Sequence, residues 1–537
     1  MMNLREHRPG WDDQRVRGAD IPVCRFRRLS SRLFPDSGLE SPENRQAGKP
    51  APRSGLRPIV NAGFVSRVGA TLALTLLAVA AQEFDLVINY GRVMDPESGL
   101  DAVRHVGIRG GKVVALSERV LTGTEVIDAR GLVVAPGFID LHQHAWDEDS
   151  IRFKVQDGVT SALELEVGAA DVDAWYRERE GKTPFHFGVS IGHVKSRMAV
   201  MGDRPTFLPT AESGAAKKPA SEKELAALKF RIEHGLKRGA VAVGFGLAYT
   251  PSAGAWEIIE LFRVAARYGA PCHVHMRYTG SIEPGSLQAF EELVTAALVT
   301  GAPLHVVHLQ ATGKRETFRI LQMMSEARKR GVDITAEVYP YTAGMTDIRA
   351  AIFDKGWREK FGLDYGDMQW SATGERLTAE TFAKYRKTGG MVIVHTNPER
   401  IVTGALVHPF TMVASDGLKG HPRNAGTFAR VLGFYVREQK VLSLMDGLRK
   451  ITLMPARQIE RRVPSMKNKG RIKIGCDADL VVFDPQTIRD RATYTEAFQA
   501  SEGITHVLVD GQTVVRKGDF QEKMFPGKAI RAAIVTD

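Results

Sequence analysis

The chain has 537 residues, which is too long for one small domain and is compatible with one large domain and a minor one. Hydrophobic residues make up 43% of the chain and charged residues 25%, as in ordinary soluble globular proteins. The formal net charge is +11, and three cysteines are too few for a disulfide framework, so a cysteine-stabilised scaffold is excluded.

The first sixty residues carry much of the positive charge, with twelve arginines and lysines against seven acidic residues. This segment is rich in proline, serine and glycine and lacks apolar periodicity, which predicts disorder over residues 1–60. A basic segment can bind nucleic acid, but the basic residues here are not interleaved with a pattern of stacking aromatic residues. We therefore expect no nucleic-acid partner.

Residues 61–82 have the layout of a secretory signal peptide, in which Arg67 precedes an apolar run that ends in small residues. The run is shorter than the ~20 residues that a transmembrane helix needs, so no stable membrane insertion is expected after leader removal. Because a signal peptide stands at the true N-terminus, residues 1–60 are interpreted as upstream sequence included by a wrong start, with Val60 or Val65 as the real start. The expected location is periplasmic or secreted, and cytoplasmic if the signal-like segment is not used.

Short strand-like segments separated by glycine-rich turns occupy both ends of the remaining chain, residues 83–135 and 456–537. They predict a small β-sandwich side domain built from both chain ends. Between them, residues 136–455 alternate strand-like and helix-like patterns, which predicts an α/β protein with a TIM-like (β/α)8 barrel. The largest insertion, about 342–411, falls between the last two strands and is interpreted as a lid.

Eight strand–helix units account for the barrel region. The strands are expected at 138–142, 159–165, 185–191, 240–246, 271–275, 303–308, 333–338 and 412–416. The expected helices include 221–238, 255–268, 286–299, 316–330 and 443–450.

Residues that bind metals stand at the ends of several expected strands, where a (β/α)8 barrel carries its reactive groups. The first strand ends in His142 and His144, whose side chains point the same way because residues i and i+2 of a strand share a face. Carboxylates that face a barrel interior are costly unless they are paired or bind a metal. The metal-capable residues at the strand ends are His142, His144, Glu164, Glu166, His275, His308 and Asp416.

Other polar residues of these strands have simpler interpretations. His273 and His305 stand earlier in their strands, so we expect packed, hydrogen-bonded histidines rather than ligands. Glu164 is equally suited to orienting a ligand imidazole from behind.

Imidazole nitrogen and carboxylate oxygen suit zinc and similar divalent metals. Such a metal lowers the pKa of bound water to about 7 and polarises a carbonyl group. Asp416, expected at the mouth of the barrel, is suited to accept a proton from the water and pass it to a leaving amine. The pattern indicates an enzyme that uses a metal to hydrolyse an amide or related C–N bond.

Several stretches of the chain resemble the amidohydrolase superfamily and, within it, the D-aminoacylase (N-acyl-D-amino-acid deacylase) group. They include "PGFIDLHQH", "VVHLQATG", "TAEVYPYTAG" and "GCDADLVVFDP", and the string from Ser415 to Glu438 is specific to this group. The resemblance covers nearly the whole chain after the signal-like segment. It implies a metal-dependent hydrolase that splits an N-acyl-D-amino acid into a D-amino acid and a carboxylate.

The resemblance also implies a set of metal ligands. His142 and His144 match the ligands of the more buried metal, and Asp416 matches the catalytic acid/base that also contacts it. His275 and His308 match the ligands of a second metal. One or two Zn²⁺ ions per chain are therefore expected.

The chain departs from the group at two places. The second strand commonly ends in a cysteine that bridges two metals, but this chain reads "ELEVG" there. A carboxylate can bridge two metals as a thiolate can, so Glu166 is expected to replace the cysteine, with Glu164 as the runner-up. A lysine of the group that follows the sixth strand is Gln310 here, and Arg277 or Lys314 is a candidate to restore the lost charge.

The implied partner is a small-molecule substrate with a free carboxylate. Arg423 matches the arginine that binds the α-carboxylate, and a guanidinium fork fits a carboxylate geometrically. Tyr339 or Tyr341 matches a tyrosine near the same carboxylate or the scissile carbonyl.

Two other interpretations stay open. A cyclic-amide hydrolase or a dipeptidase of the same superfamily also fits, although the fourth strand, "AVAVGFGLAY", has no lysine of the kind that some subtypes carboxylate. A metal-free binding or scaffold protein on this fold would be expected to lose the His-x-His pair or Asp416, and both are present. The pattern indicates neither an oligomeric state nor an acyl chain.

Overall fold

The computed structural model describes residues 84–536. The expectations for residues 1–60 and 61–82 lie outside the described residues. Within the described part of the chain, no helix has the length and apolar character needed to cross a membrane.

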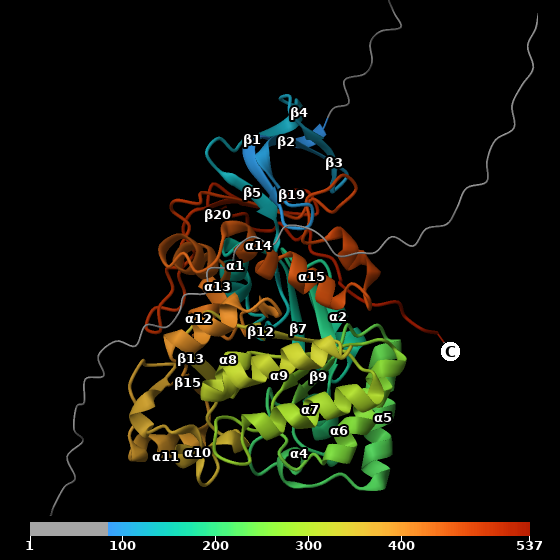
Figure 1. The fold of residues 1–537 in the computed structure, drawn as a ribbon, viewed down its shortest axis with the longest axis vertical. Helices are drawn as coiled ribbons and strands as arrows, with labels where there is room; N and C mark the ends of the chain where they lie inside the picture. The colour runs from blue at the N-terminus through green and yellow to red at the C-terminus, as the bar shows by residue number, and fades with distance from the viewer. Residues whose placement is uncertain (1–83, 537) are drawn as a thin grey trace, which may run out of the picture. The chain divides into compact units, whose positions relative to one another are not determined.

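A mixed sheet of nine strands joins the two ends of the chain (Figure 1). The junction is the antiparallel pair of β5 and β17, in which Val134 lies opposite Val482. The apolar faces of these strands form a core of their own, which includes Ile88, Val106 and Leu508. The strands are β1 (Phe84–Asp95), β2 (Leu100–Arg109), β3 (Lys112–Ser117), β4 (Gly123–Asp128), β5 (Val133–Pro136), β17 (Leu480–Phe483), β18 (Ile504–Val509), β19 (Gln512–Arg516) and β20 (Asp519–Phe520).

A second sheet of eight parallel strands forms the barrel, in the order β16-β12-β11-β10-β9-β8-β7-β6. Every residue of β7 is buried, as expected of a parallel strand covered on both faces. The strands are β6 (Phe138–Asp140), β7 (Val159–Ala169), β8 (His186–Gly192), β9 (Val243–Gly246), β10 (Cys272–His275), β11 (Leu304–Val306), β12 (Ile334–Val338) and β16 (Thr411–Val413).

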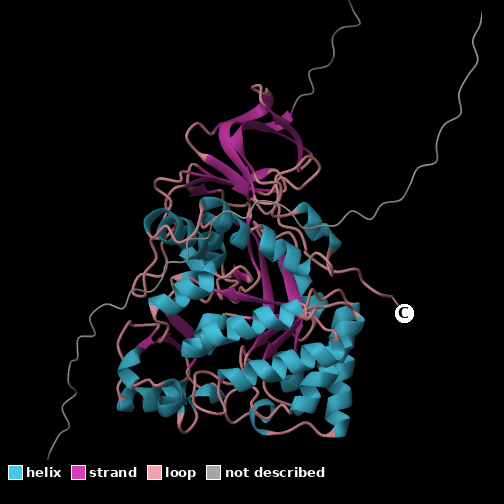
Figure 2. Ribbon diagram, viewed as in Figure 1, coloured by secondary structure: helices cyan, strands magenta, loops and turns pink. Residues whose placement is uncertain are grey.

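Helices connect and surround these strands (Figure 2). Their starts follow local rules: Ser221 and Glu224 form a capping box at the start of α5, which satisfies backbone N–H groups that the helix leaves free. The helices are α1 (Glu148–Gln156), α2 (Val172–Arg179), α3 (His193–Met201), α4 (Gly214–Lys217), α5 (Glu222–Lys237), α6 (Ala255–Arg267), α7 (Ser286–Thr300), α8 (Leu309–Gly313), α9 (Thr317–Lys329), α12 (Glu399–Val407), α13 (Arg423–Arg430), α14 (Leu444–Ile451) and α15 (Leu453–Ile459).

A buried polar network brings the first and last barrel strands together. The carboxylate of Asp140 accepts a hydrogen bond from the backbone N–H of Ser415 at 2.9 Å and another from Lys154 Nζ at 2.9 Å. Lys154 also donates to the Ser415 hydroxyl at 2.7 Å. Beyond it, the backbone N–H of Gly417 donates to the carbonyl of His142 at 3.2 Å. The network fixes the residues that follow β6 beside those that follow β16.

The region between β12 and β16 builds a small three-stranded antiparallel sheet. Its strands are β13 (Ala343–Asp347), β14 (Met368–Trp370) and β15 (Met391–His395), accompanied by α10 (Trp357–Phe361) and α11 (Ala379–Thr388). A separate apolar core, which includes Phe353, Trp357 and Trp370, stabilises this insertion. Helix α12 closes the region and packs against α9, so it belongs to the helices around the barrel.

The structure confirms the expected fold class, a TIM-like barrel with a side domain of strands from both chain ends. Eight of the nine side-domain strands form one hydrogen-bonded path, and the ninth, β4, pairs with β1 beside that path. Strand boundaries differ where the backbone turns early or late. Strand β7 continues through Ala169, whereas β11 ends at Val306 because His308 adopts a left-handed conformation with φ of 32°.

Candidate metal centre

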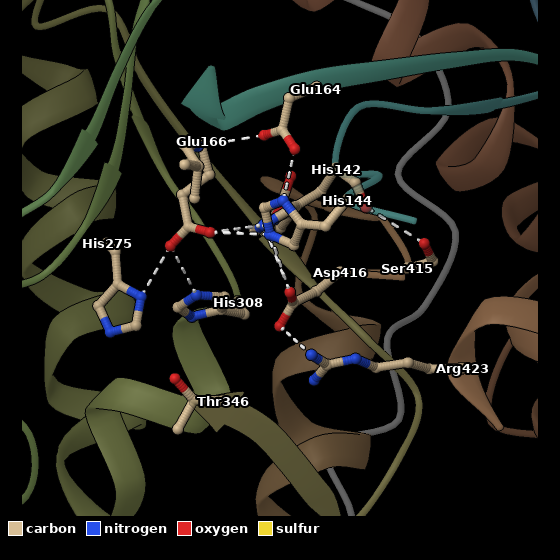
Figure 3. A network of polar contacts seen from close by, with 12 residues as sticks. His142, His144, Glu164, Glu166, His275, His308, Thr346, Ser415, Asp416 and Arg423 are labelled. Atoms are coloured by element: carbon tan, nitrogen blue, oxygen red, sulfur yellow. Dashed lines mark hydrogen bonds and ion pairs between the residues drawn. The ribbon is translucent and has the colours of Figure 1, made fainter. Parts of the chain in front are cut away.

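Histidines and carboxylates converge in a pocket at the carboxyl ends of the barrel strands (Figure 3). His142 and His144 follow β6, Glu166 lies on β7, and Asp416 follows β16. Nε2 of His142 lies 2.9 Å from Nε2 of His144, and both nitrogens lie within 3.0 Å of the same oxygen, Oε2 of Glu166. Oδ1 of Asp416 lies 3.5 Å from His142 and 3.3 Å from His144.

A second group shares Glu166 with the first. Oε1 of Glu166 lies 2.8 Å from Nδ1 of His275 and 3.5 Å from Nε2 of His308. His275 ends β10, and His308 follows β11. In each group, the potential ligand atoms lie within 4.8 Å of one another. The two carboxylate oxygens of Glu166 therefore face different pairs of histidines, so both groups share this carboxylate.

The donor set fits a divalent metal. Both histidines of the first group turn ring nitrogens toward one point, where two carboxylates also place oxygens. Lone pairs that converge in this way repel one another unless a cation lies among them. Mixed imidazole and carboxylate ligands are those of zinc. The histidine and carboxylate side chains of this site therefore suit a zinc ion.

Carboxylates behind the ligands fix the orientation of both rings. Oε2 of Glu164 lies 2.6 Å from Nδ1 of His144, while its other oxygen accepts hydrogen bonds from the backbone N–H groups of Val167 and Gly168. Glu337 accepts from Nδ1 of His142 in the same way. Each carboxylate holds Nδ1 and so leaves Nε2 for the metal, as is common for histidine ligands.

The electrostatic field of the site is strongly negative. Burial opposes protonation of His142, but Glu337, Asp416 and Glu166 outweigh it and raise the pKa of the imidazole to about 10. Burial likewise opposes ionisation of Glu166, but the neighbouring histidines hold the pKa of the carboxyl well below its usual range. The cluster therefore stabilises positive charge at its centre.

Asp416 occupies a position set by both backbone and side-chain contacts. Its φ of 49° is uncommon for a residue with a side chain and is typical of functional sites. Oδ2 forms an ion pair with Nη2 of Arg423 at 2.8 Å. Burial would raise the pKa of Asp416, but Arg423 and His142 lower it to about 2. The carboxylate is thus ionised at neutral pH.

The structure separates the two candidate tyrosines. Tyr339 lines the pocket, and its ring lies under the guanidinium of Arg423 at 4.7 Å. The hydroxyl of Tyr341 instead lies 3.4 Å from Asp490, away from the residues that line the pocket. Nε and Nη1 of Arg423 have no hydrogen-bond partner among residues 84–536, although the side chain is fully buried.

The candidate replacements for the lost lysine lie in different places. Gln310 is buried and donates to the carbonyl of Tyr339 at 3.0 Å. Arg277 turns away to a bidentate ion pair with Glu292 on α7. Lys314 lines the pocket.

Glu337 belongs to the site but was not among the residues that the sequence analysis identified at the ends of the strands. It lies within β12, and its second oxygen is 3.0 Å from Nε2 of His305. His273 packs against His305, with ring centroids 4.4 Å apart. The expectation of hydrogen-bonded histidines is confirmed for His305 and wrong for His273, because neither ring nitrogen of His273 has a hydrogen-bond partner among residues 84–536. The signal that could have identified Glu337 is an acidic residue inside a strand-like stretch, "ITAEV".

The chain is similar in sequence to known amidohydrolases. The sequence model of the amidohydrolase family matches residues 125–515. The N-acyl-D-glutamate deacylase of Alcaligenes xylosoxydans xylosoxydans is 30% identical over 502 residues, which covers 84% of this chain and 97% of the relative. The D-aminoacylase of the same organism is 28% identical, covering 83% of this chain and 97% of the relative.

A solved structure is similar over the same part of the chain. It is the N-acyl-D-glutamate deacylase from Bordetella bronchiseptica, in complex with zinc and a phosphonate that mimics the tetrahedral intermediate of the reaction. The TM-score is 0.72 at 28% identity, covering 84% of this chain and 100% of that one.

Proposed function

The chain belongs to the amidohydrolase family, and we propose that it hydrolyses N-acyl-D-amino acids to a D-amino acid and a carboxylate. The family match confirms the resemblance seen in the motifs. One observation supports the reaction most directly. Glu166 is shared between two histidine groups, and Asp416 belongs to the first of them. The D series is carried over from the names of the relatives.

The residues that would hold the metal follow from the two groups. His142, His144, Glu166 and Asp416 would hold one ion, and Glu166, His275 and His308 a second. When bound, zinc supplies a Lewis acid that polarises the amide carbonyl and acidifies water.

Asp416 is the proposed general acid and base. It accepts a proton from the water whose oxygen attacks the amide carbon, and it returns that proton to the nitrogen as the C–N bond breaks. The ion pair with Arg423 supports this role because it keeps the carboxylate ionised before the reaction and fixes its orientation. The products are a free amine and a carboxylate.

Arg423 and Tyr339 are proposed to bind the α-carboxylate. Two of the guanidinium nitrogens lack a hydrogen-bond partner among the described side chains, and a buried donor without a partner is costly. A substrate carboxylate would satisfy them, and the Tyr339 ring beneath the guanidinium limits its movement.

The cyclic-amide alternative has less support, since β9 contains no lysine that could be carboxylated. Incubation with N-acetyl-D-amino acids and, in parallel, with cyclic amides such as hydantoins separates the two. Release of acetate and free D-amino acid is expected. Ring opening without deacetylation would contradict the proposal.

We also propose that the protein is exported. The support is the signal-like pattern of residues 61–82, which lie outside the described part of the chain. N-terminal sequencing of secreted material tests this, with a first residue near Ala81 or Gln82 expected and Met1 contradicting it.

A further inference from the structure

One cation faces the substrate pocket. Among the described residues that line it, Lys314 is the only lysine or arginine, and it shares the pocket with His144, Glu166 and Asp416. Arg423 is fully buried next to Asp416 and is not among the lining residues. Lys314 is therefore the cation that a molecule entering the pocket meets directly.

The amine of Lys314 is held by the insertion through neutral groups. Nζ donates to Oδ1 of Asn397 at 2.9 Å and to the hydroxyl of Thr396, both of which directly follow β15. Asn397 donates in turn to the hydroxyl of Tyr339 at 3.1 Å. No carboxylate of residues 84–536 forms an ion pair with Lys314. Because an ammonium has three donors, one remains for a ligand.

The surroundings make this an unfavourable place for an unpaired charge. Apolar side chains of the insertion, among them Ile352, Phe353 and Phe361, line the same pocket. Burial lowers the pKa of the Lys314 amine to about 7. A carboxylate that bound there would restore the charged form and would gain from the low local dielectric. The backbone at Lys314 also has a positive φ of 49°, a conformation rare for lysine.

We propose that Lys314 binds a second carboxylate of the substrate, distinct from the α-carboxylate at Arg423. This inference rests on the proposed function and narrows the substrate to N-acyl-D-amino acids with two acidic groups. The second carboxylate belongs either to the amino-acid side chain or to a dicarboxylic acyl group. The hydrogen-bonded path from Lys314 through Asn397 to Tyr339 joins the two carboxylate sites.

Kinetics of three substrates test the assignment and identify the source of the carboxylate. The substrates are N-acetyl-D-glutamate, N-succinyl-D-leucine and N-acetyl-D-leucine, assayed with wild type, Lys314→Met and Arg315→Met. Arg315 is the adjacent, exposed cation outside the pocket, so its variant controls for charge loss.

For Lys314→Met, we expect kcat/KM to fall about 10- to 100-fold more for one diacid than for N-acetyl-D-leucine, mainly through KM. A selective loss on N-acetyl-D-glutamate assigns the side chain, and a selective loss on N-succinyl-D-leucine assigns the acyl group. An equal loss on all three substrates, or no loss, would overturn the proposal.

Binding of two simple acids gives a result independent of turnover. By calorimetry, glutarate is expected to bind at least about tenfold more tightly than pentanoate to wild type and Arg315→Met, and to lose this advantage in Lys314→Met. Equal binding of the two acids to wild type would overturn the assignment. If no N-acyl-D-amino acid is hydrolysed but the glutarate preference depends on Lys314, the proposed function fails and the carboxylate site stands.

Discussion

Glu337 accepts a hydrogen bond from Nδ1 of His142 and so turns Nε2 of that ring toward Glu166. The two residues are far apart in the chain and meet only because β6 and β12 belong to the same barrel. Burial opposes ionisation of Glu337, but His142 and His305 hold the pKa of its carboxyl well below its usual range. Glu337 therefore both orients His142 and increases its basicity.

Replacing Glu337 by glutamine tests this role. Carboxylates that support ligand histidines typically contribute 10- to 100-fold to metal affinity, so we expect Glu337→Gln to raise the zinc dissociation constant by about that factor. Titration of the metal-free protein with zinc in a chelator-buffered series measures the change. Glu326→Gln, an exposed position on α9, is the matched control. Unchanged affinity in Glu337→Gln would show that His142 needs no support.

Variants at Glu166 and Glu164 separate a ligand from a supporting residue. Of these two residues, Glu166 alone places its oxygens toward both histidine groups, so Glu166→Ala should lower the number of zinc ions bound per chain at saturation. Glu164→Gln should leave that number unchanged and weaken affinity about tenfold, because it disturbs only the orientation of His144. Metal analysis after dialysis checks both. Loss of metal in Glu164→Gln with retention in Glu166→Ala would reverse the assignment.

Asp416→Asn should remove turnover while leaving the fold and most of the metal in place. An amide cannot accept the proton of the water, and general acid–base catalysis typically contributes about 10²- to 10⁴-fold to the rate. We expect kcat to fall by at least this factor on the best substrate, with an unchanged circular dichroism spectrum. Activity equal to that of wild type would exclude Asp416 as the proton shuttle.

The sequence predicted the barrel because each strand is a short apolar run followed by a helical pattern. This alternation can be recognised in the sequence without knowledge of contacts between distant residues. The candidate ligands stood at the carboxyl ends of the expected strands. Because all strand ends of a (β/α)8 barrel lie on one face, the sequence was enough to place these residues together. Glu166 and Glu164 stayed alternatives, because residues two apart on a strand share a face. His144 contacts both carboxylates, and the contacts of Glu166 with His275 and His308 separate the two. Arg277 follows His275 by two residues, but β10 ends at His275 and the side chain turns to Glu292. Glu337 depends on a contact between distant strands, which no local pattern contains.

Asp479 links the side domain to the barrel and should control stability in acid. Its carboxylate lies 3.0 Å from Nε2 of His186 on β8 and 2.6 Å from Nζ of Lys469, all three being buried. Burial opposes ionisation, but the neighbouring side chains of His186 and Lys469 hold the pKa of Asp479 well below its usual range. The stabilisation is therefore present above pH ~4, the ordinary carboxyl value, and is lost as the pH falls below it.

The variant Asp479→Asn should lower the free energy of unfolding at pH 7 by about 1 to 3 kcal/mol. The reason is that Lys469 loses one of its two carboxylate partners and keeps only Asp477. Its stability should also fall less steeply than that of wild type between pH 4 and 2. Urea denaturation at a series of pH values measures both. Parallel pH profiles for the two proteins would contradict the linkage.

The most direct test of the account is the hydrolysis of paired N-acetyl-D- and N-acetyl-L-amino acids by zinc-loaded protein that starts at residue 82. Glutamate, aspartate, methionine, leucine and phenylalanine cover acidic and apolar side chains, and chelator-treated protein is the control. The account predicts metal-dependent release of acetate from the D series alone. Turnover of the L series, or equal turnover after removal of the metal, would contradict it.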